Sequence, residues 1–493
     1  MIEQERMNDP LGGQAIARDL EGKGRTAAGP AGPAKVVEQA LYAARKKIYP
    51  RNVHGRFDRW RWALVWLTQL VFYGLPWLVW NGRQAVLFDL AARKFYIFGF
   101  VFWPQDFIYL TALLIIAALT LFLVTAVGGR LWCGYACPQT VYTEIFMWIE
   151  RKIEGGRAQR MLLDEAPLSA RKLAIKAAKH GAWIAVALWT GFTFVGYFTP
   201  ITGLLGEVAS LSTGPWETFW ILFYGFATYG NAGWMREQVC KYMCPYARFQ
   251  SAMFDRDTMI VTYDAARGEP RGPRSRKIER GAAALGDCVN CGLCVQVCPT
   301  GIDIRDGLQY ECIGCAACID ACDQVMGKFS YPAGLIRYST ENALAQGWSF
   351  HQMVRRVLRT RTLIYGAILF GVMAVLAGAL YLRVPLKVDI VRDRASLGRE
   401  VEGGRIENVY RIQLMNTQEM PHRFRIGASG LPGIGIAGES EVEVPAATTR
   451  QVPLRVQIDP GATAKGSHRF EVEVKAVDDE RIVAREQAVF LVR

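Results

Sequence analysis

Eight cysteines between residues 288 and 322 fall into two runs, each with the spacing C-x-x-C-x-x-C-x-x-x-C. This spacing is typical of bacterial two-cluster ferredoxins, in which three close cysteines hold one iron–sulfur cluster and the distant fourth holds the other. The spacing therefore predicts two 4Fe–4S clusters, one bound by Cys288, Cys291, Cys294 and Cys322, and the second by Cys298, Cys312, Cys315 and Cys318.

The residue types in these runs favour iron–sulfur clusters over structural zinc or disulfides. Thiolates are soft, charged donors that suit such clusters, whereas zinc sites usually combine separate C-x-x-C pairs. Gly292 and Gly314 lie inside the short turns, where left-handed backbone costs a glycine little. Pro299 follows the last cysteine of the first run and Asp323 follows that of the second, a departure that leaves the number of ligands unchanged.

Four further cysteines form two copies of the motif C-x-Y-x-C-P, at Cys133 and Cys137 and at Cys240 and Cys244. Both copies lie just past an apolar segment, so the four thiols are predicted to converge at one membrane face. Proline is favoured at the first position of a helix, which places the second cysteine of each motif at a helix N-terminus, where its pKa is lowered. Such thiolates can bind Cu(I), zinc or a third cluster, or do thiol redox work. Alternatively, these cysteines are small buried apolar residues.

The elements that must position these motifs are membrane helices. Five apolar segments are long enough, or nearly so, to cross a hydrocarbon core about 30 Å thick; they are Trp62–Trp80, Phe107–Val127, Ala182–Phe198, Trp216–Ala232 and Leu363–Leu382. Lysine and arginine are dense before the first segment, between the second and third, and between the fourth and fifth, and sparse in the other loops. The positive-inside rule then predicts a bacterial inner-membrane protein with its N-terminus and ferredoxin insert in the cytoplasm and its C-terminus in the periplasm.

Composition supports this organisation. The net charge of +13 raises the prospect of nucleic-acid binding, but the basic residues follow the predicted topology, so no nucleic-acid partner is expected. All 12 cysteines belong to the motifs above, which indicates a reducing compartment rather than a disulfide framework. Residues 1–45 are rich in Gly, Ala, Pro and charge and carry no signal peptide, which predicts a disordered cytoplasmic tail.

Residues 383–493 differ in character from the rest of the chain. Short alternating or β-branched segments are separated by Gly, Pro, Asn and Asp; they are 408–415, 422–426, 441–444, 451–458, 468–474 and 488–492. About seven such strands predict an antiparallel sandwich of immunoglobulin-like type. The segment lacks cysteine and tryptophan and shows no catalytic pattern, so we expect it to bind a partner outside the membrane.

The predicted fold class is therefore a multi-domain membrane protein. An α-helical bundle of about five spans carries a cytoplasmic two-cluster ferredoxin insert and a C-terminal immunoglobulin-like β-sandwich. The predicted parts are a tail at 1–45, helices one to four at 46–235, a cytoplasmic region at 236–361 with its ferredoxin domain at about 280–330, helix five at 362–382 and a periplasmic domain at 383–493.

Three smaller features leave alternatives open. Phe95–Trp103 is apolar but too short to span, and is either an interfacial aromatic belt or a re-entrant element with Asp106 behind it. His54 and His351 flank predicted spans on the inner side, where each is either a solvated residue or a contact for a metal or a quinone. Met235 and Met243, near the second motif, are packing residues or soft copper ligands.

Together, these motifs resemble the cytochrome c oxidase accessory protein family, CcoG/FixG, also called RdxA. The resemblance rests on two membrane-edge C-x-Y-x-C-P motifs, a two-cluster ferredoxin insert whose second run reads CIDACDQVM, and an outer immunoglobulin-like domain. It implies a role in maturing the cbb-type haem–copper oxidase, by reducing Cu(II) to Cu(I) for delivery. The residues that would act on copper are Cys133, Cys137, Cys240 and Cys244.

The predicted activity is thus that of a cupric reductase in which a cytoplasmic donor, or a quinol, reduces the clusters and the electron passes to copper. The expected partners are the bilayer, an electron donor of unknown identity, and oxidase subunits or a copper carrier. Two other functions fit the residues. One is a quinol-linked relay to a periplasmic reductase, as in other membrane polyferredoxins with C-x-x-x-C-P pairs. The other is a non-enzymatic assembly scaffold.

Overall fold

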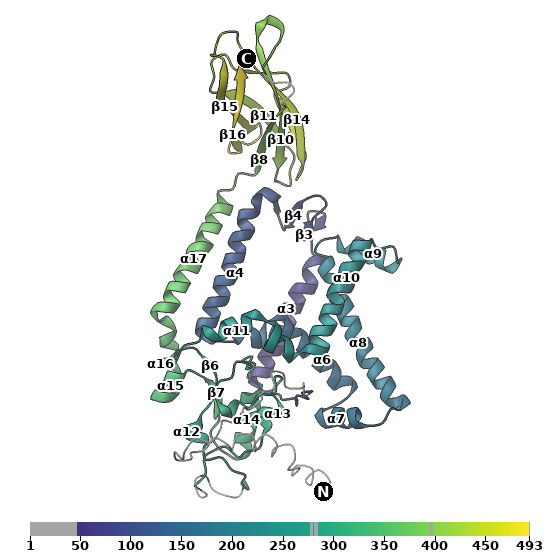
Figure 1. Cartoon of the computed structure of the whole chain (residues 1–493), viewed down its shortest axis with the longest axis vertical. Coiled ribbons are helices and arrows are strands. Elements are labelled where there is room, and N and C mark those ends of the chain that lie inside the picture. The colour runs from purple at the N-terminus through teal and green to yellow at the C-terminus, as the bar shows by residue number, and fades with distance from the viewer. Residues whose placement is uncertain (1–46, 277–279, 281–283, 394–397, 493) are drawn as a thin grey trace, which may run out of the picture. The chain divides into compact units, whose positions relative to one another are not determined.

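The computed structural model describes residues 47–276, 280, 284–393 and 398–492 (Figure 1). The predicted tail at 1–45 lies outside these residues. Each of the five apolar segments is helical over most of its length, as α3 (Arg56–Gly74), α4 (Phe107–Gly128), α8 (Ala170–Val195), α10 (Pro215–Thr228) and α17 (Thr360–Tyr381).

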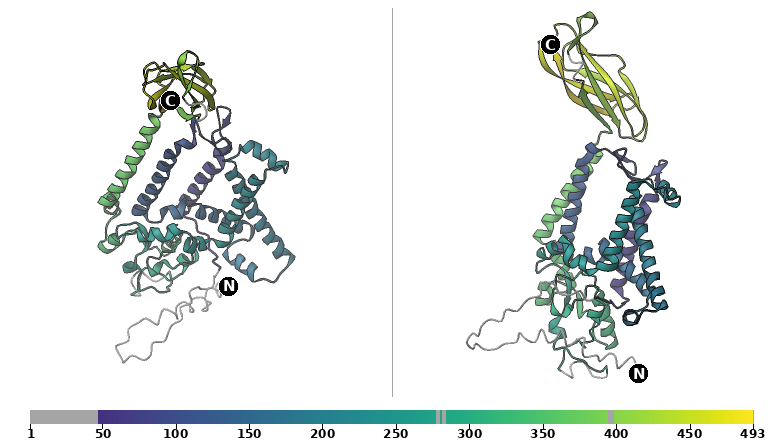
Figure 2. Two further views of the ribbon diagram at one scale, coloured as in Figure 1. Left: turned by 45° about the horizontal axis from the view of Figure 1, so that its top comes forward. Right: turned by 45° about the vertical axis from the view of Figure 1, so that its right-hand side comes forward.

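Two helices in the described part of the chain are long and apolar enough to cross a bilayer. They are the segment Pro104–Gly128, which contains α4, and α17. Figure 2 shows them side by side in both views. Their apolar stretches are almost wholly unburied, as lipid-facing surfaces would be. The chain therefore has the character of a membrane protein, and the five-span bundle stays a prediction.

The first predicted span begins and ends earlier than expected. Helix α3 includes charged residues from Arg56 onwards and stops at Gly74, because Pro76 opens a short 3₁₀ turn at Leu75–Trp77. The predicted end of the span, Val79–Trp80, is strand β1, which pairs with β2 (Arg83–Gln84).

The aromatic segment before α4 forms a small sheet. Strands β3 (Val86–Asp89), β4 (Lys94–Ile97) and β5 (Phe100–Phe102) pair antiparallel in that order. Of the two readings left open, this sheet favours the interfacial aromatic belt over the re-entrant element, because the alternating aromatic side chains pair across strands. Asp106 is buried behind this sheet, where it forms ion pairs with Arg383 at 2.9 Å and Lys387 at 2.5 Å.

Two π-helical segments follow α10. They are η5 (Tyr229–Met235) and η6 (Val239–Met243), with Arg236 between them at a φ of 41°. A helical turn with one extra residue is rare and frequently marks a functional site. The remaining helices between α4 and the ferredoxin region are α5 (Leu131–Tyr135), α6 (Pro138–Ile153), α7 (Arg157–Glu165), α9 (Ile201–Ala209) and α11 (Pro245–Ala252).

A two-stranded sheet joins the beginning and the end of the ferredoxin region. Strand β6 (Ile260–Tyr263) pairs antiparallel with β7 (Ile336–Ser339), and the eight cysteines lie in the chain between them. Their turns are followed by α13 (Leu293–Gln296) and α14 (Ala317–Lys328). The other helices of the region are α12 (Ala265–Gly268), α15 (Glu341–Gln346) and α16 (Phe350–Arg355).

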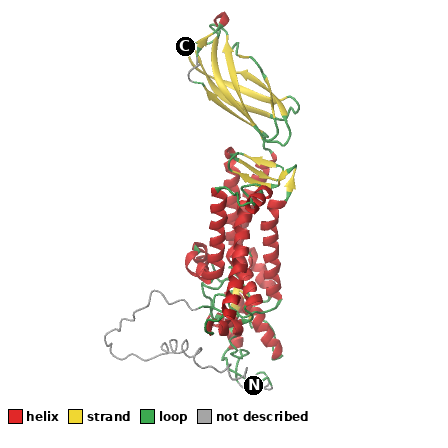
Figure 3. Ribbon diagram, turned by 90° about the vertical axis from the view of Figure 1, so that its right-hand side faces the viewer, coloured by secondary structure: helices red, strands yellow, loops and turns green. Residues whose placement is uncertain are grey.

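The C-terminal segment is a sandwich of two antiparallel sheets, coloured as strands in Figure 3. One sheet has the order β12-β14-β10-β8 with β9 beside β10, and the other has the order β13-β11-β15-β16. The strands are β8 (Leu386–Arg392), β9 (Arg399–Glu400), β10 (Ile406–Asn416), β11 (His422–Ser429), β12 (Gly435–Ala437), β13 (Glu441–Val444), β14 (Thr449–Ile458), β15 (Gly466–Ala476) and β16 (Val483–Val492). All six predicted strands are confirmed, and their alternate residues fill one core around Tyr410, Phe470 and Phe490.

Candidate functional site

The first predicted ligand set lines one cavity of the ferredoxin region. Cys288, Cys291, Cys294 and Cys322 surround it together with apolar residues and Arg305. Gly292 has a φ of 64°, which is the left-handed turn expected between the cysteines. Four thiols around a largely apolar cavity are a donor set that fits a 4Fe–4S cluster.

The second predicted set lines a neighbouring cavity. Cys298, Cys312, Cys315 and Cys318 line it, and so does Cys294 of the first set. Gly314 has a φ of 69°, again as expected. In each cavity three thiols come from one run and the fourth from the other, so the structure groups the thiols as the ferredoxin spacing predicts. Ligation itself stays a prediction.

The structure also brings the two C-x-Y-x-C-P motifs together. Cys133 lies in α5 and Cys240 in η6, while Cys137 and Cys244 are the N-cap residues of α6 and α11. The four thiols are close enough to interact electrostatically, because Cys137, Cys240 and Cys244 all raise the pKa of Cys133. Among the described residues, no three His, Cys, Asp or Glu side chains are drawn together on a single ion position.

The lowered pKa predicted for Cys137 was wrong in direction. Burial, followed by neighbouring thiols, raises the pKa of Cys133 to about 12 and that of Cys240 to about 11, against the opposing charge of Arg130. At Cys137 the backbone N–H groups of Gln139 and Thr140 lower the pKa as predicted, but burial outweighs them and the net shift is upward. A soft cation would therefore displace protons on binding here.

The first motif touches the loop of the second ligand set directly. A Cβ atom on Gly134 would lie 2.7 Å from the carbonyl oxygen of Gly314, so the two backbones meet with no room for a side chain. Arg130 donates from Nη1 to the carbonyl of Cys312 at 3.3 Å, and Tyr338 donates to the carbonyl of Gly314 at 2.5 Å. The first C-x-Y-x-C-P motif and the second cavity thus belong to one packed unit.

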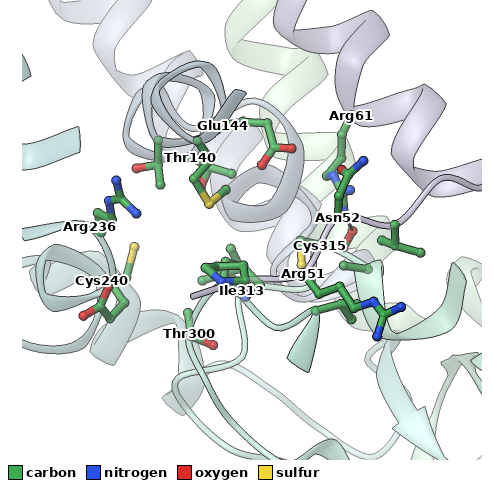
Figure 4. A pocket seen from close by; sticks show the side chains of 18 of the residues that line it. Arg51, Asn52, Arg61, Thr140, Glu144, Arg236, Cys240, Thr300, Ile313 and Cys315 are labelled. Carbon is green, nitrogen blue, oxygen red and sulfur yellow. Dashed lines mark hydrogen bonds between the residues drawn. The ribbon is translucent and has the colours of Figure 1, made fainter. Parts of the chain in front are cut away.

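A cavity of about 60 Å³ separates the second motif from the second ligand set (Figure 4). Cys240 and Cys315 both line it, and Ile313 lies between them. Arg236 lies beside Cys240, and Arg61 lies on the side of Cys315. Further lining residues include Arg51, Asn52, Thr140, Glu144 and Thr300. The space suits an ion or a few water molecules.

Arg236 and its partners were missed by sequence reasoning. Arg236 is buried, and its Nη2 donates to Oε1 of Glu150 at 2.5 Å. Gln139, two residues after Cys137, donates to the carbonyls of Asn231 at 2.9 Å and Arg236 at 3.1 Å, which ties α6 to the π-helical segments. A charged Arg–Glu pair directly after an apolar segment, at 236–237, was the available signal.

Helix α3 is attached to the ferredoxin region by its N-terminus. Its N-cap residue, Gly55, offers no side chain, and Asp320 of α14 accepts instead from the backbone of Phe57 at 3.1 Å and Asp58 at 2.8 Å. Arg61 donates to the carbonyl of Cys315 at 2.9 Å. These bonds fix α3 against the second ligand set.

The other candidate residues lie apart from the four thiols or are exposed. His54 is exposed and faces Asp58, with 3.3 Å between Nδ1 and Oδ2, while His351 is exposed on α16. Met243 is 56% exposed next to Cys244, and Met235 is half-buried at the end of η5.

Three segments of this chain match known protein families. Residues 235–341 match a family described as a 4Fe–4S dicluster domain, and residues 110–155 match a 4Fe–4S binding domain. Residues 376–493 match the family of the Ig-like fold at the C-terminus of FixG. Nitrogen fixation protein FixG of Rhizobium meliloti (strain 1021) is 38% identical over 441 residues, which cover 82% of this chain and 83% of that protein.

This chain belongs to the FixG/RdxA family. Protein RdxA of Cereibacter sphaeroides is 38% identical over 472 residues, covering 92% of this chain and 99% of RdxA. A crystal structure of a FixG-related protein from Vibrio parahaemolyticus is 18% identical, covers 22% of this chain and 97% of its own, and has a TM-score of 0.21. Membership of this family makes the chain an iron–sulfur protein with redox character.

Proposed function

We propose that this FixG-family protein is a membrane-bound electron-transfer protein that reduces Cu(II) to Cu(I) at its four membrane-edge cysteines, in the assembly of a cbb-type cytochrome c oxidase. The observation that carries the proposal is the direct contact between the first C-x-Y-x-C-P motif and the loop of the second ligand set, at Gly134 and Gly314. A thiol-rich site packed against a cluster site is an arrangement suited to moving one electron.

The two ferredoxin cavities supply single-electron carriers when their clusters are bound. The protein's own residues then define where an electron can leave. The backbone of Arg130–Gly134 lies against the carbonyls of Cys312 and Gly314, and Cys240 and Cys315 line a common small cavity. The electron would therefore leave through the second ligand set, whose loop contacts the first membrane-edge motif and whose Cys315 shares a cavity with Cys240.

Copper suits these thiols because Cu(I) is softer than Cu(II) and prefers thiolate ligands. One Cu(II) ion takes up one electron and becomes Cu(I), with no bond to carbon formed or broken. The buried thiols would release their protons as either cation binds, and the resulting soft thiolates would hold Cu(I) in preference to Cu(II). The product is then in the form that a copper carrier accepts.

The proposed topology places this chemistry at the cytoplasmic face of the inner membrane. It has five spans, α3, α4, α8, α10 with η5, and α17, and is supported by the alternation of basic and non-basic loops. The proposed domains keep their predicted bounds, with the ferredoxin domain at about 280–330 in the cytoplasm and residues 383–493 in the periplasm. The sandwich would bind oxidase subunits or a copper carrier there.

The test uses full-length protein purified without oxygen and reduced with dithionite, with excess reductant removed. Stoichiometric Cu(II) is added, cluster oxidation is followed by visible absorption, and Cu(I) is trapped with a chromogenic chelator. We expect serine at the four membrane-edge cysteines to slow Cu(I) formation at least tenfold. The matched control is Tyr242→Phe, since Tyr242 lies between Cys240 and Cys244 and is 60% exposed.

The proposal fails if the four-serine variant forms Cu(I) as fast as the unaltered protein at equal iron content.

The 4Fe–4S match at residues 110–155 favours a second candidate function for the same thiols, which is to bind a third cluster. The only cysteines in that segment are Cys133 and Cys137. Two thiols are half of a cluster's ligands, so a third cluster would need Cys240 and Cys244 as well. Loss of about four irons in the four-serine variant would support that candidate instead.

A further inference from the structure

We propose that a groove between α3, α6 and α8 binds a hydroquinone with a long apolar tail, and that this is the electron donor of the protein. The inference deepens the proposed function and rests on it for the membrane position of these helices.

The groove has the size and lining of a ligand site. Its volume is about 1090 Å³, just above the usual range for small-molecule pockets. Aromatic and aliphatic side chains form most of its wall, including Trp62, Trp66, Leu70, Trp148 and Trp189. Such a wall accommodates an isoprenoid chain along the direction of the helices.

One end of the groove is polar and offers hydrogen-bond partners to a hydroquinone ring. His54 and Asp58 line it, with His54 exposed and the Asp58 carboxylate buried. Arg151 and Lys152 of α6 lie at the groove as well. A hydroquinone hydroxyl donates to a carboxylate or an imidazole nitrogen, and an exposed imidazole connects the ring to water.

This polar end lies one ion pair away from the second ligand set. Asp58 accepts from Arg61 Nη2 at 3.0 Å, and Arg61 Nη1 donates to the carbonyl of Cys315 at 2.9 Å. Asn52 and Arg151 line both the groove and the small cavity shared by Cys240 and Cys315. The groove therefore opens where an electron could enter the ferredoxin region from the membrane.

A hydroquinone hydroxyl can donate to the Asp58 carboxylate, a hydrogen bond that a phosphate ester without a proton cannot make. A phospholipid head group would instead pair with Arg151 and Lys152, which line the same end, so the test includes a phospholipid competitor. Oxidation of one hydroquinone to quinone releases two electrons and two protons. The two cluster sites, when loaded, would take one electron each, and the exposed His54 would connect the ring hydroxyls to water for the two protons.

The test is photolabelling of the full-length protein in phosphatidylcholine nanodiscs with a decyl-tailed benzoquinone that carries an azide on its ring. Because the azide is on the head group, labelled peptides report where the ring lies. We expect label within residues 52–66, at the start of α3. We also expect Ala185→Trp, which fills the groove from an exposed position on α8, to reduce labelling at least tenfold. Ile184→Trp is the matched control, because Ile184 is exposed beside it and does not line the groove.

Competition for the photolabel tests the proposal even if the Ala185→Trp variant folds poorly. Unlabelled decylubiquinone should suppress the label in the unaltered protein, and dioleoylphosphatidylglycerol should not. Label only outside residues 52–66, equal labelling of Ala185→Trp, or displacement by the phospholipid would overturn the proposal. Labelling requires no copper, so a failure of cupric reduction and a failure of hydroquinone binding are separate results.

Discussion

The thiols of the two cysteine systems of this protein are brought together in different ways. The eight ferredoxin cysteines lie within residues 288–322, and each cavity takes three of its four thiols from one short run. The four membrane-edge cysteines come from two motifs, at 133–137 and 240–244, with several helices between them. In the first system the turns bring the thiols together, and in the second the packing of helices does so.

This difference shows which contacts hold the thiols of each site in place. A ferredoxin ligand set depends on local turns such as those at Gly292 and Gly314, so distant substitutions should disturb it little. The membrane-edge set depends on long-range contacts, above all the bonds of Gln139 to η5 and of Arg236 to Glu150. We expect substitutions in those partners to affect the two systems unequally.

The largest expected effect separates the two systems by iron content. Cys318→Ser removes one of four thiols from the second cavity, so we expect the iron content to fall from about eight to about four per chain. Cys133→Ser should leave iron unchanged, because its thiol lies outside both cavities. Iron assay and electron paramagnetic resonance of the reduced protein measure both. A similar iron loss in Cys133→Ser would erase the distinction and indicate a third cluster.

Arg236→Ala should destabilise the membrane-edge system selectively. The change removes the partner that lies 2.5 Å from Glu150, while Arg160 stays 3.2 Å from its other oxygen. The loss is therefore smaller than the cost of about 3–5 kcal/mol for a buried charge left unpaired, but larger than that of an exposed pair. We expect a lower unfolding temperature by calorimetry, with iron content retained at low temperature. Arg425→Ala is the control, because its pair with Glu441 is exposed and worth about 0–1 kcal/mol. Equal effects of the two substitutions would contradict the role given to Arg236.

The smallest expected effect concerns the contact between the two systems. Gly134→Ala introduces a Cβ atom 2.7 Å from the Gly314 carbonyl and forces the backbones apart, at a cost of about 1–3 kcal/mol. We expect slower Cu(I) formation with both ligand sets intact. Gly181→Ala, a helical glycine with open space around it, is the matched control and should leave the rate unchanged. An unaltered rate in Gly134→Ala would mean that this contact is not on the electron path.

Much of the fold followed from local patterns, because periodicity and turn residues act over a few positions. The six predicted strands of the sandwich, the helix that starts at Pro138 and the left-handed turns at Gly292 and Gly314 are confirmed. The sheet at 86–102 was missed, since short aromatic strands resemble a membrane-interface segment in sequence. The upward pKa shifts at Cys133 and Cys137 were missed because burial cannot be read from the motif.

The sequence by itself determined the ferredoxin chemistry, since the ligand spacing is a property of neighbouring residues. It also indicated that the two C-x-Y-x-C-P motifs belong together. Only the tertiary structure decided that the first motif packs on the second ligand set, that Arg236 and Glu150 form a buried pair beside it, and that a groove reaches Asp58. Those features depend on contacts between residues far apart in the chain, and the free energy of such contacts comes from burial and close packing, which local sequence does not encode.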